Sequence, residues 1–453
     1  MSVPAPRVPS EPTAAPRPPL LVVHPGAELY GADRVLLESA TALASRFTVT
    51  VAVPGPGPLV GELAARGVRV ETCPMPVLRN AALRPRGAVR LLADAVRGTL
   101  PALRLLRRHG VAGVYVNTLT LPSWPLLARL AGRRSVCHVH EAEQSAPRLL
   151  RLGMALCPAL ADRVVANSRF TLDVLAEIAP RLRRRSTVVH NAVRGPADPV
   201  PARAGLTGPL RLLYVGRLSP RKGPQVALAT LQELLARGVD ARLTLVGSVF
   251  AGYEWFEAEL RGTVDEAGLG DRVDFAGFSA DVWPHLAAAD VVLVPSVGDE
   301  SFGNTAVEAL LAARPLVVSA HSGLREAAAG YAAVEAVDAG RPGEWADAVQ
   351  RLTADWSATR TAALADAAEA RRRHAPERYR DELVAAVAGP DAAPATPLAS
   401  HLTVTKRNRP GGLRSWSRPR TGDGTPPGDD RQSSELMDSP VHSSSTGGIQ
   451  TCQ

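Results

Sequence analysis

Aromatic side chains are scarce in this chain, where they make up 4% of 453 residues. Proteins that bind single-stranded nucleic acid stack the bases on aromatic side chains. The sequence offers neither such a platform nor a recognised nucleic-acid motif, although its formal net charge is +8. We therefore expect no nucleic acid among the partners of this protein.

Cysteine is also rare. The four cysteines, Cys73, Cys137, Cys157 and Cys452, are far apart and form no C-x-x-C pair. Structural zinc sites and disulfide frameworks use closely and regularly spaced cysteines. The pattern predicts reduced structural thiols, with neither a disulfide nor a zinc site.

Long apolar runs are missing as well. No run in the chain approaches the roughly 20 residues that a helix needs to cross a bilayer. The amino terminus, MSVPAPRVPS, lacks the charged, apolar and cleavage segments of a signal peptide. From these two absences we predict a cytoplasmic protein.

Both ends of the chain lack periodic apolar residues. Residues 1–19 are rich in proline, and residues 390–453 are rich in proline, serine, glycine and aspartate. Such segments bury too little apolar surface to offset the entropy that is lost when they become ordered. We predict disordered tails at both ends.

Between the tails, short β-branched runs alternate with segments of helical spacing, which is typical of parallel sheets with crossover helices. A first series runs from LLVVHPG to STVVHNA and a second from LRLLYVG to PLVVSAH, with a Pro/Gly/Ala segment between them. The pattern predicts an α/β protein with two Rossmann-like, doubly wound domains that face each other across a cleft. The expected parts are an N-terminal domain (20–195), a linker (196–209), a C-terminal domain (210–375) and a C-terminal helix (376–389).

The segment YVGRLSPRKG carries the strongest local signal. A predicted strand ends at Val215, and Arg217 and Lys222 follow on one loop. Lys222 is one of only two lysines in a chain that otherwise uses arginine. A lysine here indicates a site that needs a compact ammonium group rather than a planar guanidinium group; chance placement is the alternative.

The segment PSVGDESFGNTAVEALLA predicts a strand end, a loop of small residues and the start of a helix. The first amides of a helix have no partner within it and attract anions, so those of Gly303, Asn304 and Thr305 form a candidate phosphate site. Glu300 and Glu308 flank this site. Carboxylates beside a phosphate suit a ligand that also carries sugar hydroxyls, whereas an ordinary helix cap is the alternative.

Together these two segments resemble the nucleotide-binding half of the family 4 retaining glycosyltransferases. The signature of that family is G-R-x-x-x-x-K-G followed by two glutamates separated by seven residues, and both parts occur here in that order. The resemblance extends over roughly residues 20–388 and includes HPGAELYGADRVL, CHVHEAE and VVHNAV. It implies the GT-B fold and an enzyme of the transferase class EC 2.4.

The resemblance also implies roles for individual residues. Arg217 and Lys222 would hold the diphosphate of a nucleotide-sugar donor and neutralise the leaving group. Glu300 would contact the transferred sugar, and Glu308 would accept hydrogen bonds from the ribose hydroxyls.

In the first domain, the resemblance matches Gly31 to the glycine-rich loop of the family and His140 to its strand-end histidine. His138 is the competing candidate. Alternate residues of a strand share one face, so both histidines point the same way, but only His140 ends the strand at the cleft. His140 is therefore the preferred catalytic candidate, and a purely structural role for it is the alternative. His190 and Asn191 are expected to shape the entry to the linker.

No D-x-D sequence occurs in the chain, so the metal ligands of the other large glycosyltransferase fold are missing. We expect no metal ion and no cofactor, because the nucleotide sugar is the substrate. The resemblance implies that cationic side chains and a helix dipole supply the positive charge, with the amides of Asn304 and Thr305 cradling phosphate oxygens. It also implies retention of the anomeric configuration, with the leaving phosphate helping to deprotonate the acceptor.

Charge is unevenly distributed along the chain. Eight arginines and one acid, Asp94, lie between Arg79 and Arg108. In RLLADAVRGTLPALRLLRR, leucine and arginine alternate at helical spacing, as in helices that lie on anionic lipid; a solvated helix face is the alternative. The basic face favours peripheral contact with an anionic membrane and a glycan or lipid-linked acceptor, in surface polysaccharide or glycolipid biosynthesis.

Three other functions remain as alternatives. A dinucleotide-dependent oxidoreductase fits poorly, because HPGAELYG contains no G-x-G-x-x-G. A GT-B-like epimerase or phosphorylase would lack a separate acceptor sugar or would require phosphate. A non-catalytic nucleotide-sugar-binding protein would keep the donor contacts without transfer.

Overall fold

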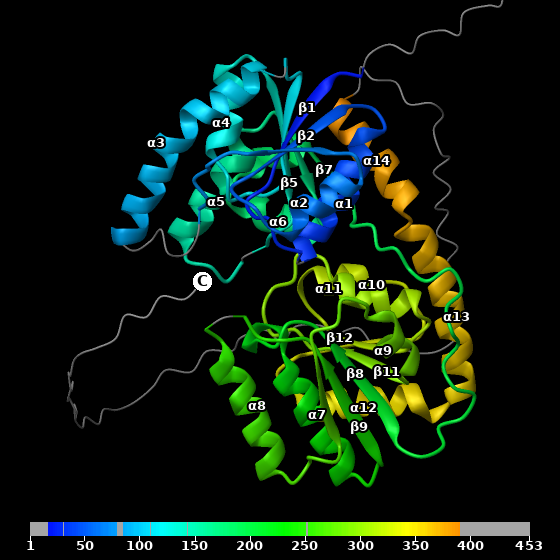
Figure 1. The fold of residues 1–453 in the computed structure, drawn as a ribbon. Helices are drawn as coiled ribbons and strands as arrows, with labels where there is room; N and C mark the ends of the chain where they lie inside the picture. The colour runs from blue at the N-terminus through cyan, green and yellow to red at the C-terminus, as the bar shows by residue number, and fades with distance from the viewer. Residues whose placement is uncertain are drawn as a thin grey trace, which may run out of the picture. The chain divides into compact units, whose positions relative to one another are not determined.

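The computed structural model describes residues 17–389, apart from Tyr30, residues 79–84, His109, Glu143 and Ala251. The predicted tails fall outside these residues, except for positions 17–19. Two parallel α/β sheets occupy the described part of the chain (Figure 1). The predicted fold class is therefore confirmed.

The N-terminal domain is built on a sheet of seven parallel strands in the order β3-β2-β1-β4-β5-β6-β7. Each strand coincides with one of the β-branched runs in the first series of the sequence. Their bounds are β1 (Pro19–Val23), β2 (Thr48–Val53), β3 (Arg69–Thr72), β4 (Gly113–Val116), β5 (Arg134–Val139), β6 (Arg163–Ala166) and β7 (Ser186–Val188). Crossover helices join them, namely α1 (Gly31–Ala44), α2 (Pro58–Ala65), α3 (Pro85–Arg108), α4 (Ser123–Leu130), α5 (Arg148–Leu160) and α6 (Arg169–Ile178).

The C-terminal domain is built on a second parallel sheet of six strands, in the order β10-β9-β8-β11-β12-β13. Its strands are β8 (Leu210–Val215), β9 (Ala241–Val246), β10 (Val273–Gly277), β11 (Val291–Val294), β12 (Leu316–Ser319) and β13 (Val334–Val337). The last of these, β13, has no counterpart among the strands predicted from sequence. The connecting helices are α7 (Pro224–Ala236), α8 (Glu254–Glu266), α9 (Trp283–Ala288), α10 (Asn304–Leu311), α11 (Ser322–Ala327) and α12 (Pro342–Ala354).

Helices cover both faces of each sheet, which explains why the strands are apolar on both sides. In β1, Leu21 and Val23 belong to one core cluster and Leu20 and Val22 to another. Because alternate side chains of a strand point to opposite faces, these clusters fill the two sides of the first sheet. The second sheet likewise lies between two clusters.

The end of the described chain returns to the first domain. Helix α13 (Trp356–Arg373) packs against α10, and α14 (Pro376–Ala388) packs against α1, as the orange helix of Figure 1 shows. The hydroxyl of Tyr379 on α14 lies 2.6 Å from that of Ser39 on α1. The chain therefore passes from a helix packed on the C-terminal domain to a final helix packed on the N-terminal domain, which ties the two domains together.

The sheet topology positions the ligand site. In each sheet the strand order reverses next to the first strand, between β1 and β4 and between β8 and β11. Open α/β sheets bind ligands at the carboxyl ends of the strands beside such a reversal. Among the described residues, no helix combines the length and apolar character that crossing a membrane would require.

Candidate functional site

Two adjoining pockets lie at the carboxyl ends of the strands and take residues from both domains. One, here called the His140 pocket, includes His140, Glu300 and Gly303. The other, the Arg217 pocket, includes Arg217 and Glu308. The two pockets share five lining residues: Gly31, Val215, Lys222, Asn304 and Thr305. All nine predicted site residues therefore line one continuous cleft.

Lys222 and Glu300 form the central ion pair of this cleft. Lys222 ends a short 3-10 turn after β8, and its Nζ lies 2.7 Å from Glu300 Oε1. Gly223 follows with φ 73°, and a Cβ there would lie 1.8 Å from the carbonyl oxygen of Pro295. Glycine at this position therefore lets the lysine turn approach the end of β11.

Glu300 is a buried carboxylate that stays ionised. Burial by itself raises the pKa of Glu300, but the charges of Lys222 and Arg221 and hydrogen bonds from Lys222 and Ser296 outweigh it, so the pKa lies below its ordinary value. The Ser296 hydroxyl lies 3.0 Å from Glu300 Oε1. A fixed negative charge thus faces the His140 pocket.

Helix α10 presents its amino terminus to both pockets. Gly303 precedes the helix with φ 118° and has no side chain to cap it. A Cβ at Gly303 would lie 2.6 Å from Leu324 Cδ2, so a side chain here would displace Leu324 in addition to straining the backbone. Its absent side chain leaves the amides of Asn304 and Thr305 directed at the cleft, where the helix dipole favours an anion.

Glu308 lies one turn further along α10 and lines the Arg217 pocket. Burial raises the pKa of Glu308 to about 7, while the charges of Arg34 and Lys222 act in the opposite direction. The carboxyl group therefore holds its proton more tightly than an exposed glutamate does. It can donate or accept a hydrogen bond near neutral pH.

Arg217 lies at the other side of the same pocket. Its guanidinium carbon is 3.3 Å from the centroid of the Phe250 ring. The hydroxyl of Tyr214 donates a hydrogen bond to the carbonyl oxygen of Arg217 at 2.7 Å. Stacking and backbone anchoring together hold this cation at the pocket wall.

His140 follows β5 and ends a chain of polar side chains from α1. Asp33 contacts His24 at 2.7 Å, His24 contacts Asn117 at 3.1 Å, and Asn117 Oδ1 lies 2.9 Å from His140 Nε2. Burial and the proximity of His24 lower the pKa of His140 to about 3. The ring is therefore neutral near pH 7, and its Nδ1 has no hydrogen-bond partner among the described residues.

The competing histidine, His138, lies outside the cleft. It shares a face with His140, at 3.9 Å between ring centroids, as the alternation along the strand predicts. However, His138 is fully buried and bonds to the hydroxyl of Tyr115. Of the two histidines, only His140 lines the His140 pocket.

Gly31, the first residue of α1, opens onto both pockets. A Cβ placed on it would meet nothing within 4 Å. The position therefore accepts a side chain without a clash in the protein, and the added atoms would occupy the cleft.

Several polar residues at the site were missed by the sequence analysis. Asn167 follows β6, Asn191 follows β7 and Ser296 follows β11, and all three line the His140 pocket. Asn191 was expected only to shape the entry to the linker, but its side-chain amide also donates to Asn304 Oδ1 at 2.9 Å. The available signal was position alone: each is a polar residue within three residues of the end of a strand.

A further feature is the arrangement of the side chains that could ligate a metal ion in the described residues. Within the described ranges, no group of three or more histidine, cysteine, aspartate or glutamate side chains is arranged to hold a metal ion. The positive charge at the cleft comes from the α10 terminus and from four side chains, those of Arg34, Arg217, Arg221 and Lys222.

Two family models match this chain, one in each domain. Residues 30–194 match the model described as Glycosyltransferase Family 4, and residues 209–355 match that of Glycosyl transferases group 1. A D-inositol 3-phosphate glycosyltransferase of Mycobacterium sp. (strain JLS) is 31% identical over 238 residues, 50% of this chain and 53% of that protein. The Acidothermus cellulolyticus protein of that name is 32% identical over 214 residues, which are 44% of this chain and 48% of that protein. The chain thus spans about half the length of the curated relatives it matches.

Solved structures extend the similarity to both domains at once. HepE from Anabaena, in complex with UDP and glucose, has 21% identity and a TM-score of 0.66, with 80% of this chain and 97% of that chain covered. A glycosyltransferase of Rickettsia africae has 16% identity and a TM-score of 0.66, with 80% and 96% covered. At these identities the likeness shows the fold.

Two Rossmann-like domains that enclose one cleft define the GT-B class. With both domains matched by their respective family models, the chain belongs to the family 4 glycosyltransferases.

Proposed function

We propose that this protein is a retaining glycosyltransferase that moves a sugar from a nucleotide-sugar donor to a glycan or lipid-linked acceptor without a metal ion. The observation that carries the proposal is the convergence of Lys222, Arg217 and the α10 amino terminus on one cleft beside two carboxyl groups. The cationic groups suit a diphosphate, and the carboxyl groups suit sugar hydroxyls. The similar Anabaena protein, in complex with UDP and glucose, supports this class of donor.

The donor diphosphate would lie where the two pockets meet. Lys222 and the amides of Asn304 and Thr305 line both pockets, so they can contact phosphate oxygens without moving far. As the bond between sugar and phosphate breaks, Lys222 and Arg217 would offset the charge that develops on the leaving group. Preorganised donors of this kind are typically worth roughly 3 kcal/mol each.

The two carboxyl groups would bind different parts of the donor, one in each pocket. Glu308 in the Arg217 pocket would bind the ribose, and Glu300 in the His140 pocket would bind the transferred sugar. His140 is neutral, so it would orient the sugar by hydrogen bonding rather than supply charge. The leaving phosphate would then assist deprotonation of the acceptor on the same face, which gives retention.

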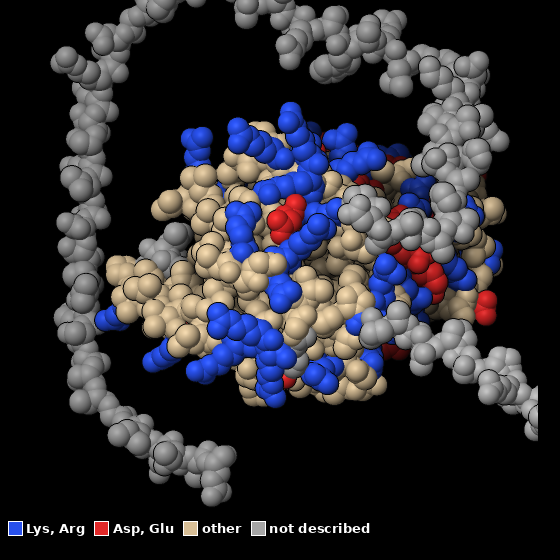
Figure 2. Space-filling view, turned by 90° about the horizontal axis from the view of Figure 1, so that it is seen from above, with Lys and Arg blue, Asp and Glu red and all other residues tan. Residues whose placement is uncertain are grey.

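The N-terminal domain carries features that suit an acceptor at a membrane. Figure 2 shows basic side chains spread over the face of this domain seen from above, with few acidic ones among them. On α3, Val89, Leu92, Val96 and Leu100 are each more than 60% exposed. We further propose that the protein contacts an anionic membrane peripherally from the cytoplasmic side, because a lipid-linked acceptor would lie in that membrane.

The test is a panel of UDP-glucose, GDP-mannose and ADP-glucose, each with and without EDTA. We expect one nucleotide class to raise the melting temperature and EDTA to have no effect. Incubation with the stabilising donor should release the nucleoside diphosphate and give an α-linked product from an α-linked donor, detected by NMR of the anomeric proton. Stabilisation without release would favour the non-catalytic binder, a requirement for phosphate would indicate a phosphorylase, and an isomerised donor would indicate an epimerase.

A further inference from the structure

The loop that carries Glu300 is held on both sides by the N-terminal domain. On one side, the amides of Gln144 and Ser145 donate to Asp299 Oδ2 at 3.0 and 3.2 Å. On the other side, the carbonyl oxygen of Ser301 accepts hydrogen bonds from the hydroxyls of Ser168 and Thr171. The position of Glu300 therefore depends on how the first domain is seated against the second.

Helix α11 holds the same residue from within the C-terminal domain. The amide of Glu300 donates to the Ser322 hydroxyl at 3.1 Å, and its carbonyl oxygen accepts from the amide of Gly323 at 2.8 Å. A Cβ at Gly323 would lie 2.4 Å from the carbonyl oxygen of Ser301. The first turn of α11 is thus packed directly against the Glu300 loop, and any displacement of the helix would move the loop.

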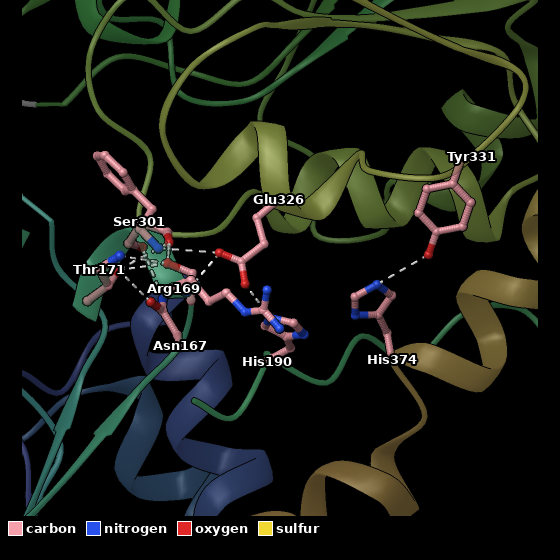
Figure 3. A network of polar contacts seen from close by, with 10 residues as sticks. Asn167, Arg169, Thr171, His190, Ser301, Glu326, Tyr331 and His374 are labelled. Atoms are coloured by element: carbon pink, nitrogen blue, oxygen red, sulfur yellow. Dashed lines mark hydrogen bonds and ion pairs between the residues drawn. The ribbon is translucent and has the colours of Figure 1, made fainter. Parts of the chain in front are cut away.

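The other end of α11 reaches the first domain through Glu326 (Figure 3). Its Oε2 accepts from the amides of Arg169 and Phe170, at 2.7 and 3.3 Å, at the start of α6. Its Oε1 lies 2.7 Å from His190 Nε2. Burial raises the pKa of Glu326, but the hydrogen bond and charge of His190 and the α6 amides outweigh it, so the pKa lies below its ordinary value. The single carboxylate of Glu326 thus connects α6 and His190 to α11.

The geometry points to Glu326 as a positioning residue, which holds Glu300 in the cleft by seating the two domains against each other through α11. Glu326 does not line either pocket, so it acts through Glu300 rather than on the ligand. The inference rests on the proposed function for its kinetic consequence, since only a transferase depends on Glu300 in this way. Its structural consequence can be measured without any activity.

The kinetic test compares Glu326→Ala and Glu326→Gln with the wild type, using the nucleotide sugar that the panel identifies. We expect Glu326→Ala to lower kcat about tenfold or more while the donor KM changes less than about threefold, because a small misplacement of a reacting group is costly. Glutamine keeps an oxygen for the α6 amides and can donate to His190, so Glu326→Gln should recover most of kcat. Glu369→Ala, which removes an ion pair with Arg373 on α13, is the matched control.

Hydrogen exchange gives the readout that is independent of activity. In Glu326→Ala, the amides of residues 169–170 and of the loop 299–304 should exchange faster, and in Glu326→Gln they should exchange as in the wild type. Faster exchange confined to α6, or equal losses in kcat for both variants, would overturn the positioning role. If the wild type transfers no sugar, the proposed function fails, while the exchange result still decides whether Glu326 holds the loop.

Discussion

Lys222 Nζ and Glu300 Oε1 lie 2.7 Å apart at the junction of the two pockets. The carboxylate is buried and the ammonium group is partly exposed, with 11% and 28% of the side chains accessible. Each group therefore offsets the charge of the other. A donor diphosphate would compete with Glu300 for the lysine and free the carboxylate to bind sugar hydroxyls.

Removing the lysine should affect both donor binding and Glu300. In Lys222→Ala, the buried carboxylate loses its nearest cation, and we expect the nucleotide sugar to give no thermal stabilisation. The value of kcat/KM should fall about 100-fold or more, in line with roughly 3 kcal/mol for one such contact. Arg272→Ala removes an exposed ion pair with Asp240 and is the control. Wild-type donor affinity in Lys222→Ala would contradict the assigned phosphate site.

Gly31 offers a way to block the cleft without disturbing the fold. Since a Cβ at this position meets nothing within 4 Å, Gly31→Leu should keep the melting temperature of the wild type within about 2 °C and lose donor binding. Gly61→Leu on α2 is the matched control, because its Cβ would also meet nothing within 4 Å. Calorimetric titration of both variants with the donor separates the outcomes. Donor binding by Gly31→Leu at the wild-type affinity would place the ligand elsewhere.

The fold was largely predictable because the strands of a doubly wound sheet are apolar on both faces. Runs such as VVLV, in which all four residues of β11 are buried, are unmistakable in sequence. The strand that was missed, β13, reads VEAV and has only its last residue buried. At the edge of the second sheet it needs less apolar character, and its sequence pattern is correspondingly weak.

That the candidate donor residues lie at strand ends was predictable from local motifs, whereas the contacts between the domains were not. Lys222 and the α10 terminus each follow a strand within a few residues, so sequence spacing alone indicates them. Glu326 binds the amide of Arg169, 157 positions away, and His190, 136 positions away. Nothing near Glu326 in sequence carries that information, because the partners are set by how the two domains meet.

Glu308 makes the stability of the protein depend on pH. Burial raises its pKa from 4.5 to about 7, so the folded state holds this proton more tightly than the unfolded state does. Its cost to stability is absent below pH 4.5, develops between pH 4.5 and 7 and is complete above pH 7. Glu308→Gln removes an ionisable group, and we expect it to raise the free energy of unfolding by about 3 kcal/mol at pH 8 and to leave it unchanged at pH 4.

The measurement for Glu308 is thermal unfolding of both proteins from pH 4 to pH 8. The two curves should coincide at low pH and diverge as the pH rises through the interval between the two pKa values. Parallel curves over the whole range would mean that Glu308 titrates normally. With donor present, Glu308→Gln should show weaker stabilisation, because glutamine accepts fewer hydrogen bonds from ribose.

Helix α3 carries two apolar faces, and the sequence could not tell which of them packs in the core. Gly98, Ala102, Leu105 and Leu106 are buried. The second face, with Val89, Leu92, Val96 and Leu100, follows helical spacing but is 61–70% exposed. Leu149, Leu152 and Leu156 form a similar exposed row on α5.

This exposed apolar face predicts binding to lipid. Helix α3 contains six arginines and one acid in 24 residues, so vesicles of anionic phospholipid should bind the protein at low salt and neutral vesicles should not. Leu92→Gln combined with Val96→Gln removes apolar area from the exposed face only, and should abolish co-sedimentation while leaving the melting temperature unchanged. Leu364→Gln on α13, an exposed leucine elsewhere, should bind as the wild type does. If the wild type ignores anionic vesicles, or if the double variant still sediments with them, the exposed face of α3 is not a membrane contact and the acceptor need not be lipid-linked.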